Sequence, residues 1–113
     1  MHELGIISAM VDSIEAIVRE QGLHEVKKIV LEVGELSGVV PHYMEACYPA
    51  AVYKTFMENT VLELETIPGI VRCRDCGREF NAMAHDFRCP GCEGQNMEIL
   101  SGNDVLIKEI DCI

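Results

Sequence analysis

Four of the six cysteines in this 113-residue chain form two pairs, each with two residues between its cysteines. Two intervening residues allow one tight turn to direct both sulfur atoms toward a single metal ion. Two such turns that face each other complete a tetrahedral site of four thiolates, which suits Zn²⁺. The pattern therefore predicts a structural zinc site with the ligands Cys73, Cys76, Cys89 and Cys92.

Two other chemistries use cysteines in a similar way. A redox dithiol normally has a single Cys-x-x-Cys motif that opens a helix, and the segment around these cysteines has no helical periodicity. An iron–sulfur or rubredoxin-like iron site uses the same four ligands and stays open as an alternative. Four thiolates leave no open coordination position, so catalysis at this metal is not expected. Gly77, Gly91 and Gly94 flank the pairs, and glycine tolerates the positive φ angles that such turns often need.

The first three residues, Met-His-Glu, offer a second set of metal ligands. The α-amine of Met1 and the amide and Nδ1 nitrogens of His2 close two adjoining chelate rings in one plane, which suits square-planar Ni²⁺ or Cu²⁺. At a helix start, deprotonating the His2 amide breaks no helical hydrogen bond. The fourth position is left for His85, His42, the Glu3 carboxylate or water. By itself the tripeptide is a weak signal, because the dipole of a helix also favours a carboxylate in its first turn.

Hydrophobic periodicity predicts the elements that position these ligands. Apolar residues at spacings of three and four predict a helix over residues 4–21, which Gly22 would end. A second helix is expected from Pro41 to about Met57, and Pro49 should kink or split it. Alternating apolar and polar residues predict strands over residues 26–34, 61–67 and 104–110.

The cysteine-bearing segment lies before the last of these strands. It is short, contains several glycines and has few large aliphatic residues, so it needs a metal ion to hold it together. We therefore predict an α+β fold. It consists of two helices packed on a three-stranded sheet, with an inserted four-cysteine zinc-ribbon lobe.

Composition and charge limit the function further. The formal net charge is −10 with nine lysine and arginine residues, which disfavours nucleic acid as a partner. No apolar run approaches the ~18 residues of a membrane span, and the N-terminus lacks a basic secretory n-region, so we expect a cytoplasmic protein without membrane contact. Structural disulfides are then not expected, and the isolated Cys47 and Cys112 should be inert.

Motifs of common enzyme classes are missing from the sequence. It contains no Gly-x-Ser-x-Gly nucleophile motif, no His-Glu-x-x-His zinc motif and no phosphate-binding loop. We therefore expect a protein that is not an enzyme. Any nucleotide hydrolysis in its function would belong to a partner.

Several segments combine into a pattern over essentially the whole chain. It opens with Met1-His2-Glu3-Leu4, continues with Leu31-Glu32-Val33-Gly34-Glu35-Leu36-Ser37-Gly38-Val39, and ends with Ile107-Lys108-Glu109-Ile110 after the two cysteine motifs. This combination resembles the HypA/HybF family of hydrogenase maturation proteins.

The resemblance implies a nickel metallochaperone. It implies delivery of Ni²⁺ to the large subunit of nickel–iron hydrogenase with a partner GTPase, HypB, and in some bacteria support of urease maturation. By resemblance, His2 is the nickel ligand, Glu3 tunes that site, and the four paired cysteines hold zinc. The nickel-binding α/β domain is expected at residues 1–69 with 103–113, and the zinc-ribbon domain at residues 70–102.

Two positions depart from the family pattern. Several members carry an acidic residue just before the second helix, where this chain has Val40, which cannot bind a metal. Pro49 interrupts a helix that is often continuous in relatives. In some members a histidine of the zinc lobe reaches the nickel, and His85 is the candidate here. The alternative functions are a zinc-ribbon adaptor that delivers nothing, and a zinc ribbon that binds nucleic acid.

Overall fold

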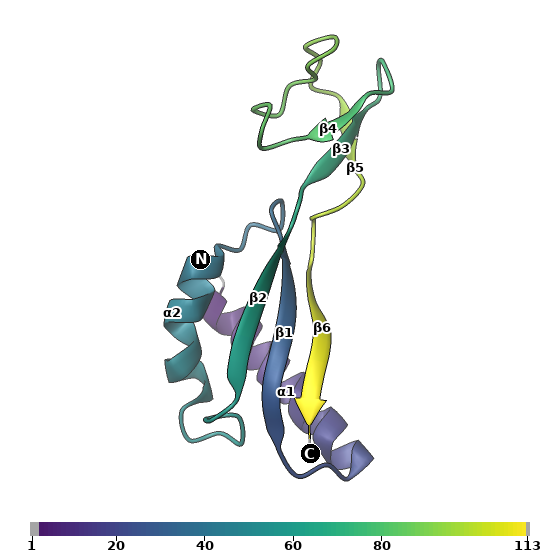
Figure 1. Ribbon diagram of the computed structural model, residues 1–113. Coiled ribbons are helices and arrows are strands. Elements are labelled where there is room, and N and C mark those ends of the chain that lie inside the picture. Colours follow the sequence, from purple (N-terminus) through teal and green to yellow (C-terminus); the bar gives the residue numbers. More distant parts are fainter. Residues whose placement is uncertain (1–2, 113) are drawn as a thin grey trace.

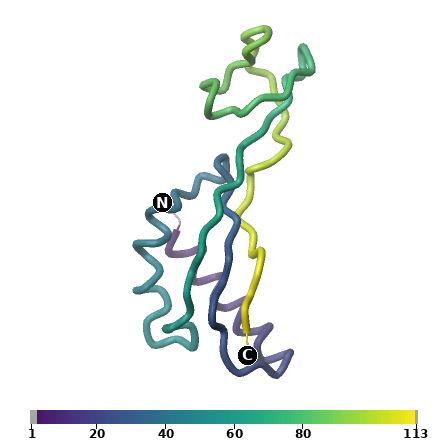
Figure 2. Tube along the Cα trace, viewed as in Figure 1, coloured from purple at the N-terminus to yellow at the C-terminus, as the bar shows by residue number. Residues whose placement is uncertain are grey.

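The computed structural model describes residues 3–112, which form an elongated molecule of 54 × 26 × 17 Å (Figure 1). One end is an α/β unit with both helices and three strands. The other end, which we call the cysteine lobe, runs from Ile70 to Ile99 and contains the remaining three strands. The chain passes from the α/β unit into the lobe once and returns once (Figure 2).

The α/β unit is built from both ends of the chain. Its central strand β1 pairs in parallel with β2 and antiparallel with β6, which gives the order β2-β1-β6. A parallel pair needs a crossover connection, and α2 provides it. The elements are α1 (Glu3–Gln21), β1 (Val26–Gly34), α2 (Pro41–Val52), β2 (Val61–Ile67) and β6 (Val105–Cys112). The predicted fold of two helices on a three-stranded sheet with an inserted lobe is confirmed.

Helix α1 forms as its sequence pattern predicts. Ile7 and Ile14 on its apolar stripe are fully buried against the sheet. The helix ends at Gly22, whose φ of 68° allows the Leu23 N–H to bond the Val18 carbonyl at 3.0 Å. A left-handed glycine that closes such a bond is a common helix C-terminus.

Helix α2 ends five residues earlier than predicted. It continues past Pro49 without a split, but stops at Val52, so the predicted extension to Met57 is wrong. The cause is the turn that follows, where the Thr55 hydroxyl donates to the Val52 carbonyl and accepts from the Met57 N–H. Lys54 has a φ of 60°, which a helix cannot accommodate.

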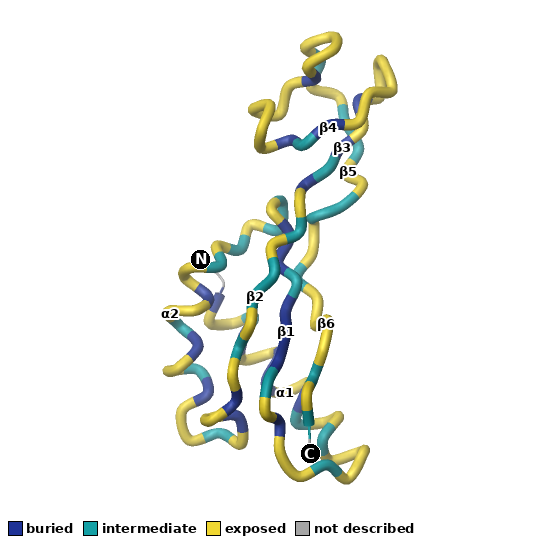
Figure 3. The backbone as a smooth tube through the Cα atoms, in the orientation of Figure 1, coloured by how far each residue is buried: buried dark blue, intermediate teal, exposed yellow. Residues whose placement is uncertain are grey.

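The core of the α/β unit lies between the helices and one face of the sheet. Strand β1 supplies its centre and is the most continuously buried stretch of the chain (Figure 3). The twelve buried members of this cluster are Ile7, Met10, Val11, Ile14, Val26, Ile29, Leu31, Val33, Met44, Tyr48, Val52 and Met57. Within the described residues, no helix is both long and apolar enough to cross a membrane.

The cysteine lobe contains a small antiparallel sheet of order β4-β3-β5. Its strands are β3 (Ile70–Cys73), β4 (Glu79–Asn81) and β5 (Met97–Ile99). The buried residues of the lobe are Val71, Cys73, Phe80, Ala82 and Cys89. So few apolar side chains leave the lobe short of hydrophobic stabilisation, as the sequence indicated.

Candidate metal centre

The four paired cysteines converge within the cysteine lobe. Their Sγ atoms all lie within 4.8 Å of one another, with Cys73 and Cys92 3.5 Å apart and Cys76 and Cys89 3.4 Å apart. A disulfide needs about 2.05 Å, so all four are free thiols. A tetrahedral zinc site with Zn–S bonds of about 2.3 Å places its sulfur atoms about 3.8 Å apart. The cluster therefore fits one tetrahedral ion.

Two similar turns direct these thiols. In the first, the Gly77 N–H donates to the Cys73 carbonyl at 2.8 Å; in the second, the Glu93 N–H donates to the Cys89 carbonyl at 2.8 Å. The Gly91 N–H also donates to the Cys89 sulfur at 3.3 Å. Cys73 and Cys89 are buried, whereas Cys76 and Cys92 are exposed, so each turn contributes one inner and one outer ligand.

The glycines around the cysteines act in two different ways. Gly77 has a φ of 78°, as predicted, but the second turn places its positive φ at Glu93, with 61°. Gly91 and Gly94 have no positive φ angle. Space is the reason for glycine there: a Cβ on Gly94 would lie 3.2 Å from the Cys92 sulfur, and one on Gly91 would lie 3.3 Å from the Arg78 guanidinium.

The protonation of the thiols also indicates a place for a cation. Backbone N–H donors of Cys92 and Gly91 lower the pKa of Cys89 to about 7. The Gly94 N–H lowers the pKa of Cys92, but the bond with Cys73, burial and the neighbouring thiols outweigh it and raise that pKa to about 12. The neighbouring cysteines thus make it harder for Cys92 to lose its proton, while Cys89 loses its proton more easily. A divalent ion removes this conflict, because it stabilises all four sulfurs as thiolates.

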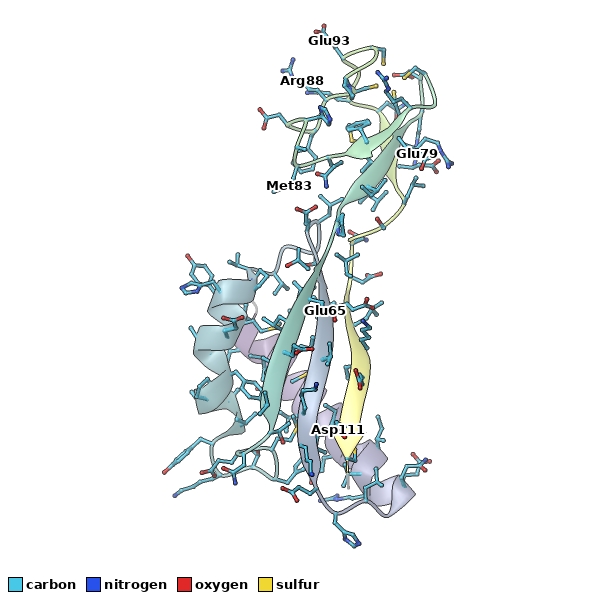
Figure 4. All side chains as sticks on the ribbon, in the orientation of Figure 1. Glu65, Glu79, Met83, Arg88, Glu93 and Asp111 are labelled. Carbon is cyan, nitrogen blue, oxygen red and sulfur yellow. The ribbon has the colours of Figure 1, made fainter. Side chains whose placement is uncertain are left out.

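Positive side chains accompany this cluster. Four of the nine basic residues of the chain, all arginines, fall within the 33 residues from 70 to 102. They are Arg72, Arg74, Arg78 and Arg88. Arg88 and Glu93 lie at the far end of the lobe (Figure 4). One of the four arginines, Arg72, is paired with Glu98 at 3.1 Å and with Glu79 at 3.4 Å.

The predicted nickel ligands are not grouped in the part of the chain that the structure describes. Met1 and His2 lie outside residues 3–112, and Glu3 is buried in the first turn of α1. His85 packs edge-on against Phe80 in the lobe, with ring centroids 5.8 Å apart. Between residues 3 and 112, the four cysteines form the one group of three or more metal-binding side chains.

The other positions singled out by sequence have ordinary structural surroundings. His42 lies beside Tyr43, with ring centroids 6.1 Å apart, in the first turn of α2. Val40 precedes that helix in extended conformation and is 42% exposed. Cys47 and Cys112 are half-buried and pack against the core of the α/β unit.

Sequence reasoning missed Glu35, which links the two parts of the molecule. Its Oε1 atom accepts hydrogen bonds from the Gly69 N–H at 2.8 Å and from Asn81 Nδ2 at 3.0 Å. Both partners are far away along the chain, so no local pattern could indicate the contacts. The only signal was an acidic residue in a glycine-containing turn, which is common in turns.

The fold and the cysteine cluster define a small protein with an α/β unit and a lobe whose four cysteines form a metal-binding site. A family model described as HypA, hydrogenase/urease nickel incorporation, metallochaperone, matches residues 1–112. The chain belongs to this family, as the resemblance of its motifs predicted.

Individual relatives support the same conclusion. The chain is 36% identical to the hydrogenase maturation factor HypA of Geotalea uraniireducens over 98% of both chains. It is 39% identical to the HypA of Nostoc sp., covering 98% of this chain and 95% of the relative. The solution structure of the Ni metallochaperone HypA from Helicobacter pylori has the same fold, with a TM-score of 0.72. That likeness covers 100% of this chain and 98% of the other, at 20% identity.

Proposed function

We propose that this chain is a nickel metallochaperone that binds Ni²⁺ at its N-terminus and delivers it to the large subunit of nickel–iron hydrogenase. The observation that carries the proposal is the family match, which starts at residue 1 and so includes the Met-His-Glu start. The family description names nickel incorporation, and the relatives bear the name of hydrogenase maturation factors. None of these names describes catalysis, and we propose a protein that is not an enzyme.

The two metals are assigned to different parts of the chain. We assign structural Zn²⁺ to residues 70–102 and nickel to residues 1–69 with 103–113. Cys73, Cys76, Cys89 and Cys92 would hold the zinc, which closes the lobe and supplies no open position for chemistry. The cluster geometry supports this assignment, because its sulfur spacing and all-thiolate donor set suit a closed tetrahedral ion.

The nickel ligands follow from the chemistry of the N-terminus. The Met1 amine and the His2 amide and Nδ1 nitrogens supply three planar donors, and the Glu3 carboxylate lies beside them in sequence. His85 or His42 is the candidate for the fourth position. All three nitrogens must lose protons, so nickel affinity rises with pH. An incomplete donor set suits an ion that is handed on to an acceptor.

The partners follow from the delivery role. The sequence has no phosphate-binding loop, so we assign nucleotide hydrolysis to a partner GTPase, HypB. The acceptor is the hydrogenase large subunit, and the family description adds urease as a second acceptor system. A cytoplasmic location is part of this proposal. The main alternative, a zinc-ribbon adaptor without delivery, differs in lacking a nickel site at His2.

A metal titration of tag-free protein tests the proposal. We expect one tightly held zinc and one exchangeable nickel with a square-planar d–d absorption band. His2→Ala should abolish nickel loading and leave zinc content unchanged. His24→Ala is the matched control, since His24 is exposed beyond the end of α1, and should load nickel normally. Normal nickel loading by His2→Ala would show that the nickel site lies elsewhere.

A further inference from the structure

The turn after β1 reaches from the α/β unit to the cysteine lobe. The N–H of Gly34 bonds the Asp104 carbonyl and the N–H of Leu36 bonds the Gly102 carbonyl, both on the connection that returns from the lobe. The N–H of Glu35 bonds the Ile67 carbonyl at 2.9 Å, where the outgoing connection begins. The backbone of β1 lies so close to the returning connection that a Cβ on Gly34 would collide with Gly102. The turn is thus fixed against both connections.

Two side chains of this turn extend to the lobe. One oxygen of Glu35 accepts from the Gly69 N–H and from the side-chain amide of Asn81, the last residue of β4. Next to it, Leu36 is half-buried against the core of the lobe. A Cβ on Gly69 would lie 2.5 Å from the Leu36 Cγ, so the two segments touch. Glu35 therefore connects the end of β1 with the lobe sheet itself.

Beyond this contact the two parts are separated by a groove of about 430 Å³. Leu36 and Gly38 line it from the α/β unit, and Val71, Met83 and Met97 line it from the lobe. Met83 lies on the side of the lobe that faces the α/β unit (Figure 4). Because this groove lies open beside them, the contacts made by Glu35 and Leu36 bear directly on the orientation of the lobe.

We propose that Glu35 is a positioning residue whose carboxylate, through Asn81 and Gly69, holds the cysteine lobe in one orientation on the α/β unit. On the basis of the proposed function, this orientation sets whether a lobe ligand such as His85 reaches the N-terminal nickel. Nickel affinity then depends on a residue that does not touch nickel.

The charge of Glu35 suits this role. The Gly69 N–H and then the Asn81 amide lower the pKa of Glu35 from its ordinary value, because both donate to its ionised form. Glu35 is therefore a carboxylate at neutral pH. Hydrogen bonds to a carboxylate are shorter and stronger than those between neutral groups, which favours one arrangement of the lobe.

Residual dipolar couplings of the full-length, zinc-loaded chain test the orientation without any nickel. We expect one alignment tensor to fit both parts of the wild type. In Glu35→Ala we expect loss of the common tensor and a smaller tensor for the lobe. Glu20→Ala, the same substitution at an exposed position near the end of α1, should behave as wild type.

Asn81 provides a second variant that tests the same contact. Asn81→Ala removes the side-chain bond but leaves the bond from the Gly69 N–H, so it should cause a smaller loss than Glu35→Ala. The double variant should be no worse than Glu35→Ala alone, because Glu35→Ala already removes the bond to Asn81. If Glu35→Ala retains the common tensor, or if the wild type already lacks it, Glu35 does not set the orientation.

A titration with NiCl₂ separates this proposal from the proposed function. If only one in ten Glu35→Ala molecules keeps the orientation, apparent nickel affinity should fall by about tenfold, because affinity scales with the competent fraction. A wild type that binds no nickel would overturn the proposed function and leave the orientation result standing. Lost orientation with unchanged nickel affinity would overturn the effect of Glu35 on nickel.

Discussion

The α/β unit buries a cluster of twelve residues, whereas the cysteine lobe buries five, two of which are cysteines. At roughly 1.5–3 kcal/mol for each large apolar side chain, burial alone can stabilise the first unit. The lobe has only Val71 and Phe80 as large buried apolar residues beside its cysteines. The difference suggests two sources of stability in one chain: apolar burial in the α/β unit and a metal ion in the lobe. A cavity in the core should therefore affect the first unit, and loss of a cysteine should affect the lobe.

Charge separates the two parts as well. Residues 70–102 carry four arginines and five acidic residues. The rest of the chain carries five basic and fourteen acidic residues, so nearly all of the net charge of −10 lies outside that segment. The nearly balanced segment is the one that contains the four paired cysteines, for which we propose a zinc ion.

The largest expected effect comes from removing one of the four proposed zinc ligands. Cys73→Ala should unfold the lobe, because a structural zinc site contributes its binding free energy, ~10–16 kcal/mol in zinc-finger peptides, to folding. The α/β unit should keep its fold, since its core contains none of the four paired cysteines. Zinc content and ¹⁵N–¹H spectra measure the two effects separately.

A matched control uses another cysteine of the same chain. Cys47→Ala alters a half-buried residue of α2 and should leave zinc content unchanged. Full zinc content in Cys73→Ala would contradict the four-cysteine assignment. Unfolding of the α/β unit in that variant would show that the two parts do not have separate sources of stability.

A smaller effect is expected from a cavity in the α/β core. Met44 on α2 is fully buried, and Met44→Ala should lower the free energy of unfolding by about 2–5 kcal/mol. Urea denaturation measures this loss, and zinc content should stay at the wild-type level. Leu106→Ala, at a position that is 56% exposed, should change stability by only about 0.5 kcal/mol. Zinc loss in Met44→Ala would mean that the lobe depends on the α/β core.

Local patterns account for what the sequence could predict. The stripe of α1 and the alternation of β1 and β2 are contained in the segments themselves, and the Cys-x-x-Cys motifs indicate which thiols meet. The end of α2 was predicted wrongly because Thr55 and Lys54 end it through a turn, which apolar spacing does not reveal. The apolar spacing typical of a helix continues to Met57. In the structure Met57 is buried, but it belongs to the turn after α2 and not to the helix.

Contacts between segments far apart in the chain could not be predicted from local sequence patterns. Glu35 and Asn81 are 46 residues apart, and their bond exists only because β4 and the end of β1 meet at the junction. The two turns of the cysteine cluster look alike in sequence, yet their positive φ angles fall at Gly77 and at Glu93. The nickel ligands Met1 and His2 lie outside the described residues and remain predictions from sequence.

The smallest expected effect concerns the buried hydroxyl of Tyr48, which connects α2 with the start of β2 by a hydrogen bond. Tyr48 donates to the Thr60 carbonyl at 2.9 Å, and Thr60 donates to the Val26 carbonyl at 2.6 Å. Tyr48→Phe removes one such bond and should cost about 1 kcal/mol of unfolding free energy, measured by urea denaturation. Tyr43→Phe, at a position that is 56% exposed, is the control and should cost nothing measurable.

The same hydroxyl should make the stability of the α/β unit depend on alkaline pH. Burial raises the pKa of Tyr48 to about 12 from its ordinary 10. Between these values the unfolded chain releases the proton while the folded chain keeps it, so the free energy of unfolding falls as pH rises. Tyr48→Phe should reduce that slope, whereas Tyr43→Phe and Cys73→Ala should not. An equal slope in wild type and Tyr48→Phe would show that the hydroxyl is not held in the core, and would weaken the contrast between a unit built on burial and a lobe built on metal.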